Sequence, residues 1–266
     1  MNILASIVWN VSPEIIQLGP IHIRWYGLLF ALGFILGYTI MSWIFKIENK
    51  SPKALESLTI YLVLGTVIGA RLGHCLFYEP DYYLANPIEM LYVWKGGLAS
   101  HGAGIGILLA LLVFNRRFKD IKLLWVFDRV VIPVALAAFL VRMGNLFNSE
   151  IIGRPTDLPW AFIFTSVDNI PRHPSQLYEG ISYLIIFFII FFIYKRYKSS
   201  LPPGRIAGIF LILLFGARFF IEFFKETQAD FEKTLPLYMG QILSIPFVLL
   251  GIYFLYYSFT KEKFKS

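Results

Sequence analysis

The sequence predicts an all-α polytopic membrane protein with seven transmembrane helices and a small extracytoplasmic head. Of the 266 residues, 57% are hydrophobic and only 15% are charged, which is a composition typical of integral membrane proteins. Apolar windows of about 20 residues, the length that crosses a hydrocarbon core, recur along the chain. Lys and Arg gather at alternate ends of these windows, as the positive-inside rule requires of a protein that crosses the membrane repeatedly.

The apolar windows define the predicted spans, and together they predict a single integral membrane domain over residues 1–266. In chain order, the spans are expected at about 23–45, 57–78, 97–114, 123–144, 176–194, 204–224 and 237–259. The head is expected at about 145–175, where several prolines flank the apolar run 160–164 and favour a short hairpin. Residues 1–22 are expected along the outer membrane interface.

The basic residues of the connecting segments predict the orientation. Most of them lie at one set of span ends, around 46–53, 116–122, 195–205 and 261–265. Because positive residues stay on the cytoplasmic side, seven spans place the N-terminus outside and the C-terminus in the cytoplasm. The net charge of +7 does not indicate a nucleic-acid partner, because the basic residues are spread over several loops and form no single stripe.

Small residues four positions apart predict close packing between helices in lipid. They occur in the first three spans, at Gly33, Gly37, Gly65, Gly69, Gly73, Gly102 and Gly106. The single cysteine, Cys75, lies inside the second span and excludes an intramolecular disulfide. The four histidines show no HExxH motif and no acidic partner at ligand spacing, so we predict neither a metal nor another cofactor.

Charged and amide side chains gather where the fourth predicted span ends. Arg142, Asn145, Asn148 and Glu150 follow one another within a few helical turns. Such groups are costly at a membrane and are usually functional. Arginine offers a planar fork of donors, and asparagine supplies both donors and acceptors. The cluster therefore predicts a site for a phosphate-bearing lipid headgroup.

Other unusual polar residues fall at the same outer level when their depth is counted from the span ends. Tyr26 opens the first span, Arg71 lies near the outer end of the second, and His101 lies one turn into the third. Arg218 and Glu222 lie toward the outer end of the sixth span and, being four apart, share one helical face. Their convergence predicts a cavity in the outer leaflet.

Each of these residues also fits a structural role when it is taken alone. Arg218 with Glu222 fits an ion pair that holds helices together, and Arg71 fits a long side chain that reaches the interface. His101 is compatible with a hydrogen-bonded core histidine, and Tyr26 with an aromatic belt. The prediction of a site therefore rests on the convergence of the residues and not on any one of them.

Seven ordered motifs run nearly from end to end of the chain, at 23–28, 69–73, 94–102, 142–154, 172–179, 218–224 and 239–246. In this series the chain resembles the prolipoprotein diacylglyceryl transferases of bacterial membranes. It departs from that pattern at Val141, where glycine commonly precedes the arginine, and at Lys225 with Thr227, which replace a usual Arg-Glu-Pro ending. The second departure affects the expected loop and not the expected reaction.

The resemblance implies transfer of the diacylglyceryl group of phosphatidylglycerol to the lipobox cysteine thiol of a prolipoprotein. The products would be a thioether and glycerol 1-phosphate. The implied partners are phosphatidylglycerol and prolipoprotein signal peptides, and the implied location is the bacterial inner (cytoplasmic) membrane. An anionic-lipid transporter or flippase is the alternative, because it would also place arginines in a lateral cavity, although it requires access from both sides.

The implied reaction needs a base for a thiol whose ordinary pKa is about 8.5, and it needs cations for the charge that leaves. We expect Arg142 and Arg218 to grip the phosphate, with Glu222 orienting Arg218. His101 is the expected base, because imidazole titrates nearest neutral pH, unless it orients the headgroup instead. The expected substrate-binding residues further include Tyr26, Asn145, Glu150, Gly153 and Arg71.

Overall fold

The computed structural model describes residues 6–19, 21–93, 96–226 and 236–263. Trp94 and Lys95, with which one of the seven motifs begins, and Thr227 lie outside the described residues. The chain divides into two compact units, Met1–Ile40 with Asp128–Ser266 and Met41–Phe127. Helices α1 and α5 each continue from one unit into the other.

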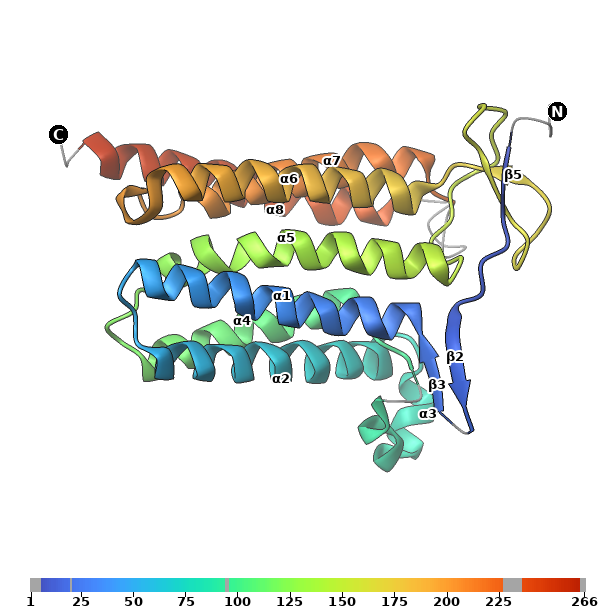
Figure 1. Ribbon diagram of the computed structural model, residues 1–266, viewed down its shortest axis with the longest axis horizontal. Helices are drawn as coiled ribbons and strands as arrows, with labels where there is room; N and C mark the ends of the chain where they lie inside the picture. The colour runs from blue at the N-terminus through green and yellow to red at the C-terminus, as the bar shows by residue number, and fades with distance from the viewer. Residues whose placement is uncertain (1–5, 20, 94–95, 227–235, 264–266) are drawn as a thin grey trace. The chain divides into compact units, whose positions relative to one another are not determined.

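Helices make up most of the described chain (Figure 1). The long ones are α1 (Trp25–Ile47), α2 (Pro52–Phe77), α4 (Ser100–Arg117), α5 (Leu123–Phe147), α6 (Ser175–Tyr197), α7 (Arg205–Ile221) and α8 (Met239–Lys263). The short ones are α3 (Pro80–Ala85) and the 3-10 helices η2 (Pro87–Leu91), η4 (Lys198–Ser200) and η5 (Glu222–Phe224). Each predicted span therefore overlaps one long helix.

Six helical segments in the described part of the chain are long and apolar enough to cross a membrane. They contain α1, α2, α5, α6, α7 and α8. Helix α4 falls short by the same measure, because its 18 residues include His101 and end in the polar run 115–117. The all-helical membrane class is confirmed, while the crossing of α4 stays a prediction.

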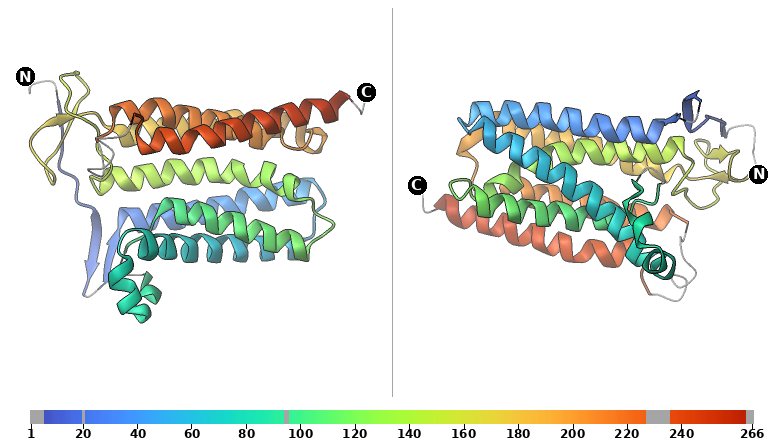
Figure 2. Two further views of the ribbon diagram at one scale, coloured as in Figure 1. Left: turned by 180° about the vertical axis from the view of Figure 1, so that it is seen from behind. Right: turned by 90° about the horizontal axis from the view of Figure 1, so that it is seen from below.

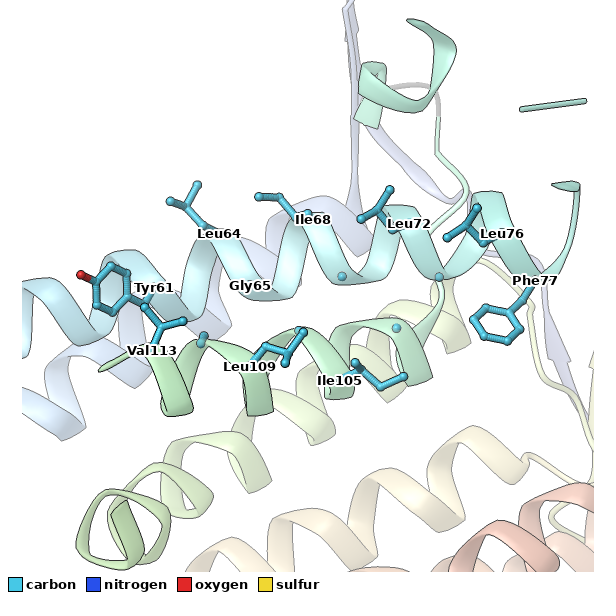
Figure 3. A pocket seen from close by; sticks show the side chains of 15 residues that line it. Tyr61, Leu64, Gly65, Ile68, Leu72, Leu76, Phe77, Ile105, Leu109 and Val113 are labelled. Atoms are coloured by element: carbon cyan, nitrogen blue, oxygen red, sulfur yellow. The ribbon is translucent and has the colours of Figure 1, made fainter. Parts of the chain in front are cut away.

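Helices α2 and α4 pack against each other through glycines, as their spacing predicted. A Cβ added to Gly65 would lie 2.6 Å from the carbonyl oxygen of Gly106, and one added to Gly73 would lie 2.7 Å from Gly102 Cα. The pair is bordered by an apolar groove of about 420 Å³, whose lining includes Ile68 (Figure 3). An exposed apolar surface of this kind suits contact with lipid.

Helices α6, α7 and α8 lie side by side (Figures 1 and 2). Asp128 of α5 holds the start of α7, because its Oδ2 accepts from the backbone N–H of Gly204 at 2.7 Å and its Oδ1 accepts from that of Ala207 at 2.9 Å. The Asp128 side chain is 1% exposed, so these bonds supply the partners that a buried carboxylate requires. This contact fixes the helix that carries Arg218.

The segment between α5 and α6 folds around a small sheet. Strand β4 (Phe162–Phe164) pairs antiparallel with β5 (Pro171–Arg172), which is the predicted short hairpin, and parallel with β1 (Ile7–Trp9). The Trp9 indole donates to the carbonyl oxygen of Leu146 at 3.1 Å. Strands β2 (Glu14–Leu18) and β3 (Ile21–Arg24) form a separate antiparallel pair before α1. The pairing of β1 with β4 was not predicted from the sequence.

Arg172 ties this segment to the chain that follows η5. Its Nη2 lies 2.6 Å from Asp168 Oδ2, its Nη1 donates to the carbonyl oxygen of Gly153 at 3.2 Å, and it also pairs with Glu226. The hydrogen bond from Arg172 lowers the pKa of Asp168 below its ordinary value, because it favours the carboxylate. The segment is thus a folded structure held at both ends and not a plain connector.

The glycine contact between α2 and α4 gives a matched pair of variants. We expect Gly106→Leu to lower the free energy of unfolding by about 3 kcal/mol or more, because its side chain would overlap the backbone of Gly65. Gly104 lies on the same helix with nothing within 4 Å of an added Cβ, so Gly104→Leu should leave stability nearly unchanged. Thermal unfolding in detergent measures both, and equal melting temperatures would contradict the packing described.

Candidate active site

Arg142 lies near the end of α5 and is held from two sides. Its Nε lies 2.7 Å from Oε2 of Glu179 on α6, and its Nη1 donates to Oδ1 of Asn145 at 3.1 Å. Arg142 is 9% exposed and Glu179 is 0% exposed. The contact with Glu179 is an ion pair and not a hydrogen bond, because Glu179 Oε2 has no hydrogen-bond partner among the described residues. The ion pair and the hydrogen bond to Asn145 together restrain the guanidinium group.

Asn145 joins this arginine to a second carboxylate. Its Nδ2 donates to Oε2 of Glu150 at 3.1 Å, and Asn148 Nδ2 donates to the other carboxylate oxygen at 3.1 Å. The cluster predicted at the end of the fourth span therefore forms a continuous chain from a cation, through an amide, to an exposed carboxylate. The Arg142 guanidinium group and the Glu150 carboxylate, which can accept hydrogen bonds from hydroxyl groups, are thus linked through one amide.

The turn that carries Glu150 is strained and is held by the start of α6. Ser149 and Ile151 have φ of 54° and 55°, a left-handed conformation that costs a non-glycine residue about 1 kcal/mol. Ser175 Oγ donates to the carbonyl oxygen of Ile151 at 2.6 Å, and Gln176 Nε2 donates to that of Glu150 at 2.6 Å. Strain of this kind persists where the surroundings enforce it, which is common at functional sites.

Tyr26, at the start of α1, packs against the same end of α5. An added Cβ at Gly144 would lie 2.7 Å from the Tyr26 ring, so this glycine allows the close approach. Tyr26 is half-buried and interacts electrostatically with both Arg142 and Glu150. The structure thus brings together four of the predicted site residues, namely Tyr26, Arg142, Asn145 and Glu150.

Lys225 is a buried cation that the sequence analysis did not place in the site. Its Nζ lies 2.9 Å from Oε1 of Glu179 and 3.0 Å from Oε2 of Glu222, and the residue is 5% exposed. Gly240 of α8 leaves room for the Glu222 carboxylate, because an added Cβ would overlap it. Glu222 thus pairs with Lys225, and the orientation of Arg218 by Glu222 stays a prediction.

Glu179 was also missed, although the sequence contains a signal for it. A single carboxylate within the otherwise apolar span 176–194 is costly in lipid unless it has a partner. From this cost, Glu179 could have been predicted to be a functional residue or the partner of a cation. Spacing alone did not show which cations it would meet, because Arg142 and Lys225 approach it from distant parts of the chain.

Arg218 lies near this group and has an open donor. It interacts electrostatically with Glu179 and with Tyr183 of α6. Its Nε is buried and has no hydrogen-bond partner among the described residues. A buried donor without a partner costs free energy that a bound anion would recover.

Gly153 lies where three stretches of backbone meet. Its N–H donates to the carbonyl oxygen of His173 at 3.0 Å, and it forms a β-bridge with Lys225. A side chain is excluded, because an added Cβ would lie 2.8 Å from the carbonyl oxygen of Phe224. The observed contacts of Gly153 are therefore packing contacts, and its contact with substrate stays a prediction.

Arg71 and His101 belong to the other compact unit. Arg71 is 2% exposed and donates to backbone carbonyl oxygens of Glu89 at 2.7 Å, Met90 at 3.0 Å and Gly96 at 2.6 Å. These bonds use most of its donors on the backbone of residues 89–90 and 96–97. Its contact with substrate stays a prediction.

His101 is exposed in the first turn of α4 and lies beside aromatic rings. Its ring centroid is 5.3 Å from that of Phe77, with the rings edge to face, and 5.8 Å from that of Tyr78. An exposed imidazole at this position is accessible to a reactant. The core-histidine alternative does not describe it, because the residue is not buried.

These features define a multi-pass membrane protein with a polar site. Six of its described helices are long and apolar enough to cross a membrane, and buried ion pairs lie at the end of α5, at the start of α6 and just after η5. The chain belongs to the prolipoprotein diacylglyceryl transferase family, whose model matches residues 13–257. The matched range contains all seven of the ordered motifs, from the one at 23–28 to the one at 239–246.

Named relatives resemble the chain over nearly its whole length. A phosphatidylglycerol–prolipoprotein diacylglyceryl transferase of Chloroherpeton thalassium is 50% identical over 258 residues, covering 97% of this chain and 96% of that protein. The protein of the same name from Tolumonas auensis is 50% identical, covering 96% and 98%. That of Bacteroides fragilis strain NCTC 9343 is 44% identical and covers 99% of both chains.

Proposed function

We propose that this chain transfers the diacylglyceryl group of phosphatidylglycerol to the lipobox cysteine of a prolipoprotein. Family membership and the names of the relatives support the reaction. The observation in the structure that carries it is the chain of contacts from Arg142 through Asn145 to Glu150. It provides a cation for a phosphodiester and, beside it, a carboxylate for the hydroxyls of a glycerol headgroup.

The reaction balances without a cofactor. The thiol loses its proton to a base, and the sulfur attacks the diacylglycerol carbon that carries the phosphate. The carbon–oxygen bond breaks as the carbon–sulfur bond forms, and glycerol 1-phosphate leaves with the bonding electrons. Catalysis then requires stabilisation of negative charge on the departing phosphate oxygen, which fixed cations in a site of low dielectric provide well.

Arg142 and Arg218 are the proposed catalytic cations. The guanidinium of Arg142 is fixed by Glu179 and Asn145, and its outer edge is proposed to meet a phosphate oxygen in the bidentate manner typical of arginine. Arg218 offers the buried Nε that has no partner in the described part of the chain. In this proposal Glu222 orients Arg218, while its carboxylate also pairs with Lys225.

The glycerol headgroup is assigned to the outer part of the same group. Glu150 accepts its hydroxyls, and Asn145 and Tyr26 flank it. Gly153 is proposed to belong to this set through the close backbone approach that it allows, which brings its backbone beside the substrate. The strained turn at Ser149 and Ile151 places Glu150 at this point.

His101 is the proposed base, because its imidazole is exposed and histidine is the side chain that most often transfers protons in catalysis. Arg71 is proposed to contact the lipid, and it also holds the backbone of Glu89 and Gly96.

The proposal includes the topology. We place α4 across the membrane as a seventh span, beside α2, so that 1–266 is one integral domain of the bacterial inner membrane. The distribution of basic residues supports an outer N-terminus and a cytoplasmic C-terminus. The segment 145–175 then lies outside the cytoplasm, where it meets the signal peptide of a secreted prolipoprotein.

A reconstituted assay tests the reaction and the headgroup site together. Purified protein is mixed with phosphatidylglycerol labelled in its acyl chains and a lipobox peptide, and the diacylglyceryl thioether is detected by mass spectrometry. We expect product from the wild type and a loss of at least about 100-fold in Arg142→Ala, because the phosphate then lacks its fixed cation. Arg142→Lys should also lose activity, since the planar fork is absent.

Arg24→Ala is the matched control, because Arg24 is an exposed arginine outside the site that pairs with Glu14. It should retain wild-type activity. No thioether from well-folded wild-type protein would contradict the proposed reaction and would favour the anionic-lipid transporter. Normal activity in both Arg142 variants would instead remove Arg142 from the site.

His101→Gln separates proton transfer from hydrogen bonding. Glutamine can hydrogen-bond the headgroup but cannot take the thiol proton, so we expect a loss in kcat of about 100-fold near neutral pH. The rate should recover in part as the pH approaches the ordinary thiol pKa of about 8.5. Steady-state rates from about pH 6 to about pH 9, a range that spans the ordinary pKa values of imidazole and thiol, provide the measurement. A variant with near-normal turnover across this range would exclude the base role.

A further inference from the structure

Glu179 is a fully buried carboxylate of α6 to which the proposed reaction assigns no contact with substrate. One of its oxygens lies 2.7 Å from Arg142 Nε and the other lies 2.9 Å from Lys225 Nζ. The hydroxyl of Tyr183, one turn along α6, donates to Oε1 at 3.3 Å. Glu179 therefore joins α5, α6 and the segment after η5 at a single point.

We propose that Glu179 is a positioning residue for the transfer, which fixes the guanidinium of Arg142 and balances the charge of the cations that receive the phosphodiester. This inference rests on the proposed function. An arginine side chain has several freely rotating bonds, so its guanidinium group can shift. A displacement of a catalytic group by about 1 Å lowers the rate roughly 100-fold. The ion pair of Nε with Glu179 and the hydrogen bond of Nη1 to Asn145 restrain the guanidinium of Arg142 through two of its nitrogens.

The charges of this group support the second part of the role. Around Glu179 itself, Arg142, Arg218 and Lys225 are three cations and Glu222 is the second carboxylate, so one positive charge remains in this inner part of the group. The exposed Glu150 lies beyond Asn145 and is not counted here. A phosphodiester carries one negative charge, and its arrival neutralises the inner part. A cluster without Glu179 would hold two excess positive charges, which would bind the lipid anion at least as well while leaving Arg142 free to move.

Positioning and simple structural support predict different kinetics. Loss of a purely structural contact would reduce the folded fraction and would leave the KM for phosphatidylglycerol unchanged. If Arg142 loses its positioning and the group gains a positive charge, kcat should fall because transition-state stabilisation is lost. The KM should fall or stay the same, because ground-state binding of the lipid is retained. Measured per folded molecule, kcat therefore distinguishes the two roles.

The test uses Glu179→Gln, which keeps the size of the side chain and removes its charge. We expect kcat to fall by about 10-fold to 100-fold, with a KM for phosphatidylglycerol no higher than that of the wild type. Equilibrium binding of labelled phosphatidylglycerol should be at least as tight as in the wild type. Ser182→Ala is the control on α6, because Ser182 Oγ bonds within its own helix, to Tyr178 O at 2.7 Å, and it should keep both constants.

Glu179→Asp provides the conservative variant, and its restored charge should recover part of kcat. If Glu179→Gln does not fold, the double variant Glu179→Gln with Lys225→Met removes one charge of each sign, and it should show the same loss of kcat because Arg142 still lacks its carboxylate. Turnover within about twofold of the wild type in Glu179→Gln or in the double variant would overturn the inference, because the expected loss is at least about tenfold, or about 1.4 kcal/mol. Weakened lipid binding would also overturn it. Failure of the wild type to form thioether in the same assay would count against the proposed function itself.

Discussion

The ion pair between Glu179 and Arg142 is the contact on which the described site depends. Both groups are buried, and a buried charge is stable only when it meets an opposite charge with good geometry. To satisfy this condition, α5 and α6 must lie close together, and Lys225 must approach from beyond η5. Because buried charges must be paired, helix ends from distant parts of the sequence lie together. The same ion pairs restrain the guanidinium group of Arg142.

Glycines and a strained turn make this arrangement sterically possible. Gly144 admits the Tyr26 ring, and Gly240 admits the carboxylate of Glu222. Gly153 lets its backbone approach those of His173 and Phe224 closely. The adjoining sheet of β1, β4 and β5 and the ion pairs of Arg172 hold the same region from the other side. In the proposed reaction, a substrate phosphate would meet cations that are already oriented, so little reorganisation would be needed.

The helices could be predicted from the sequence because long, uncharged hydrophobic windows are rare outside membrane spans. The cluster from Arg142 to Glu150 could also be predicted, since its residues are close in sequence. Lys225 could not be placed, because its contact with Glu179 arises from long-range packing. The i, i+4 spacing of Arg218 and Glu222 did not indicate the ion pair that Glu222 forms with Lys225, which lies three residues further along the chain. The pairing of β1 with β4 joins very short strands across more than half the chain, which leaves no local pattern.

In the proposed reaction, Arg142 and Arg218 receive the phosphate of the lipid substrate. A cryo-EM structure of the wild type in nanodiscs that contain phosphatidylglycerol would show whether they do. We expect phosphate density within about 3 Å of donors on both arginines, the hydrogen-bond distance, with the glycerol headgroup toward Glu150. A well-resolved lipid phosphate elsewhere, with Arg142 and Arg218 contacting only protein, would contradict it.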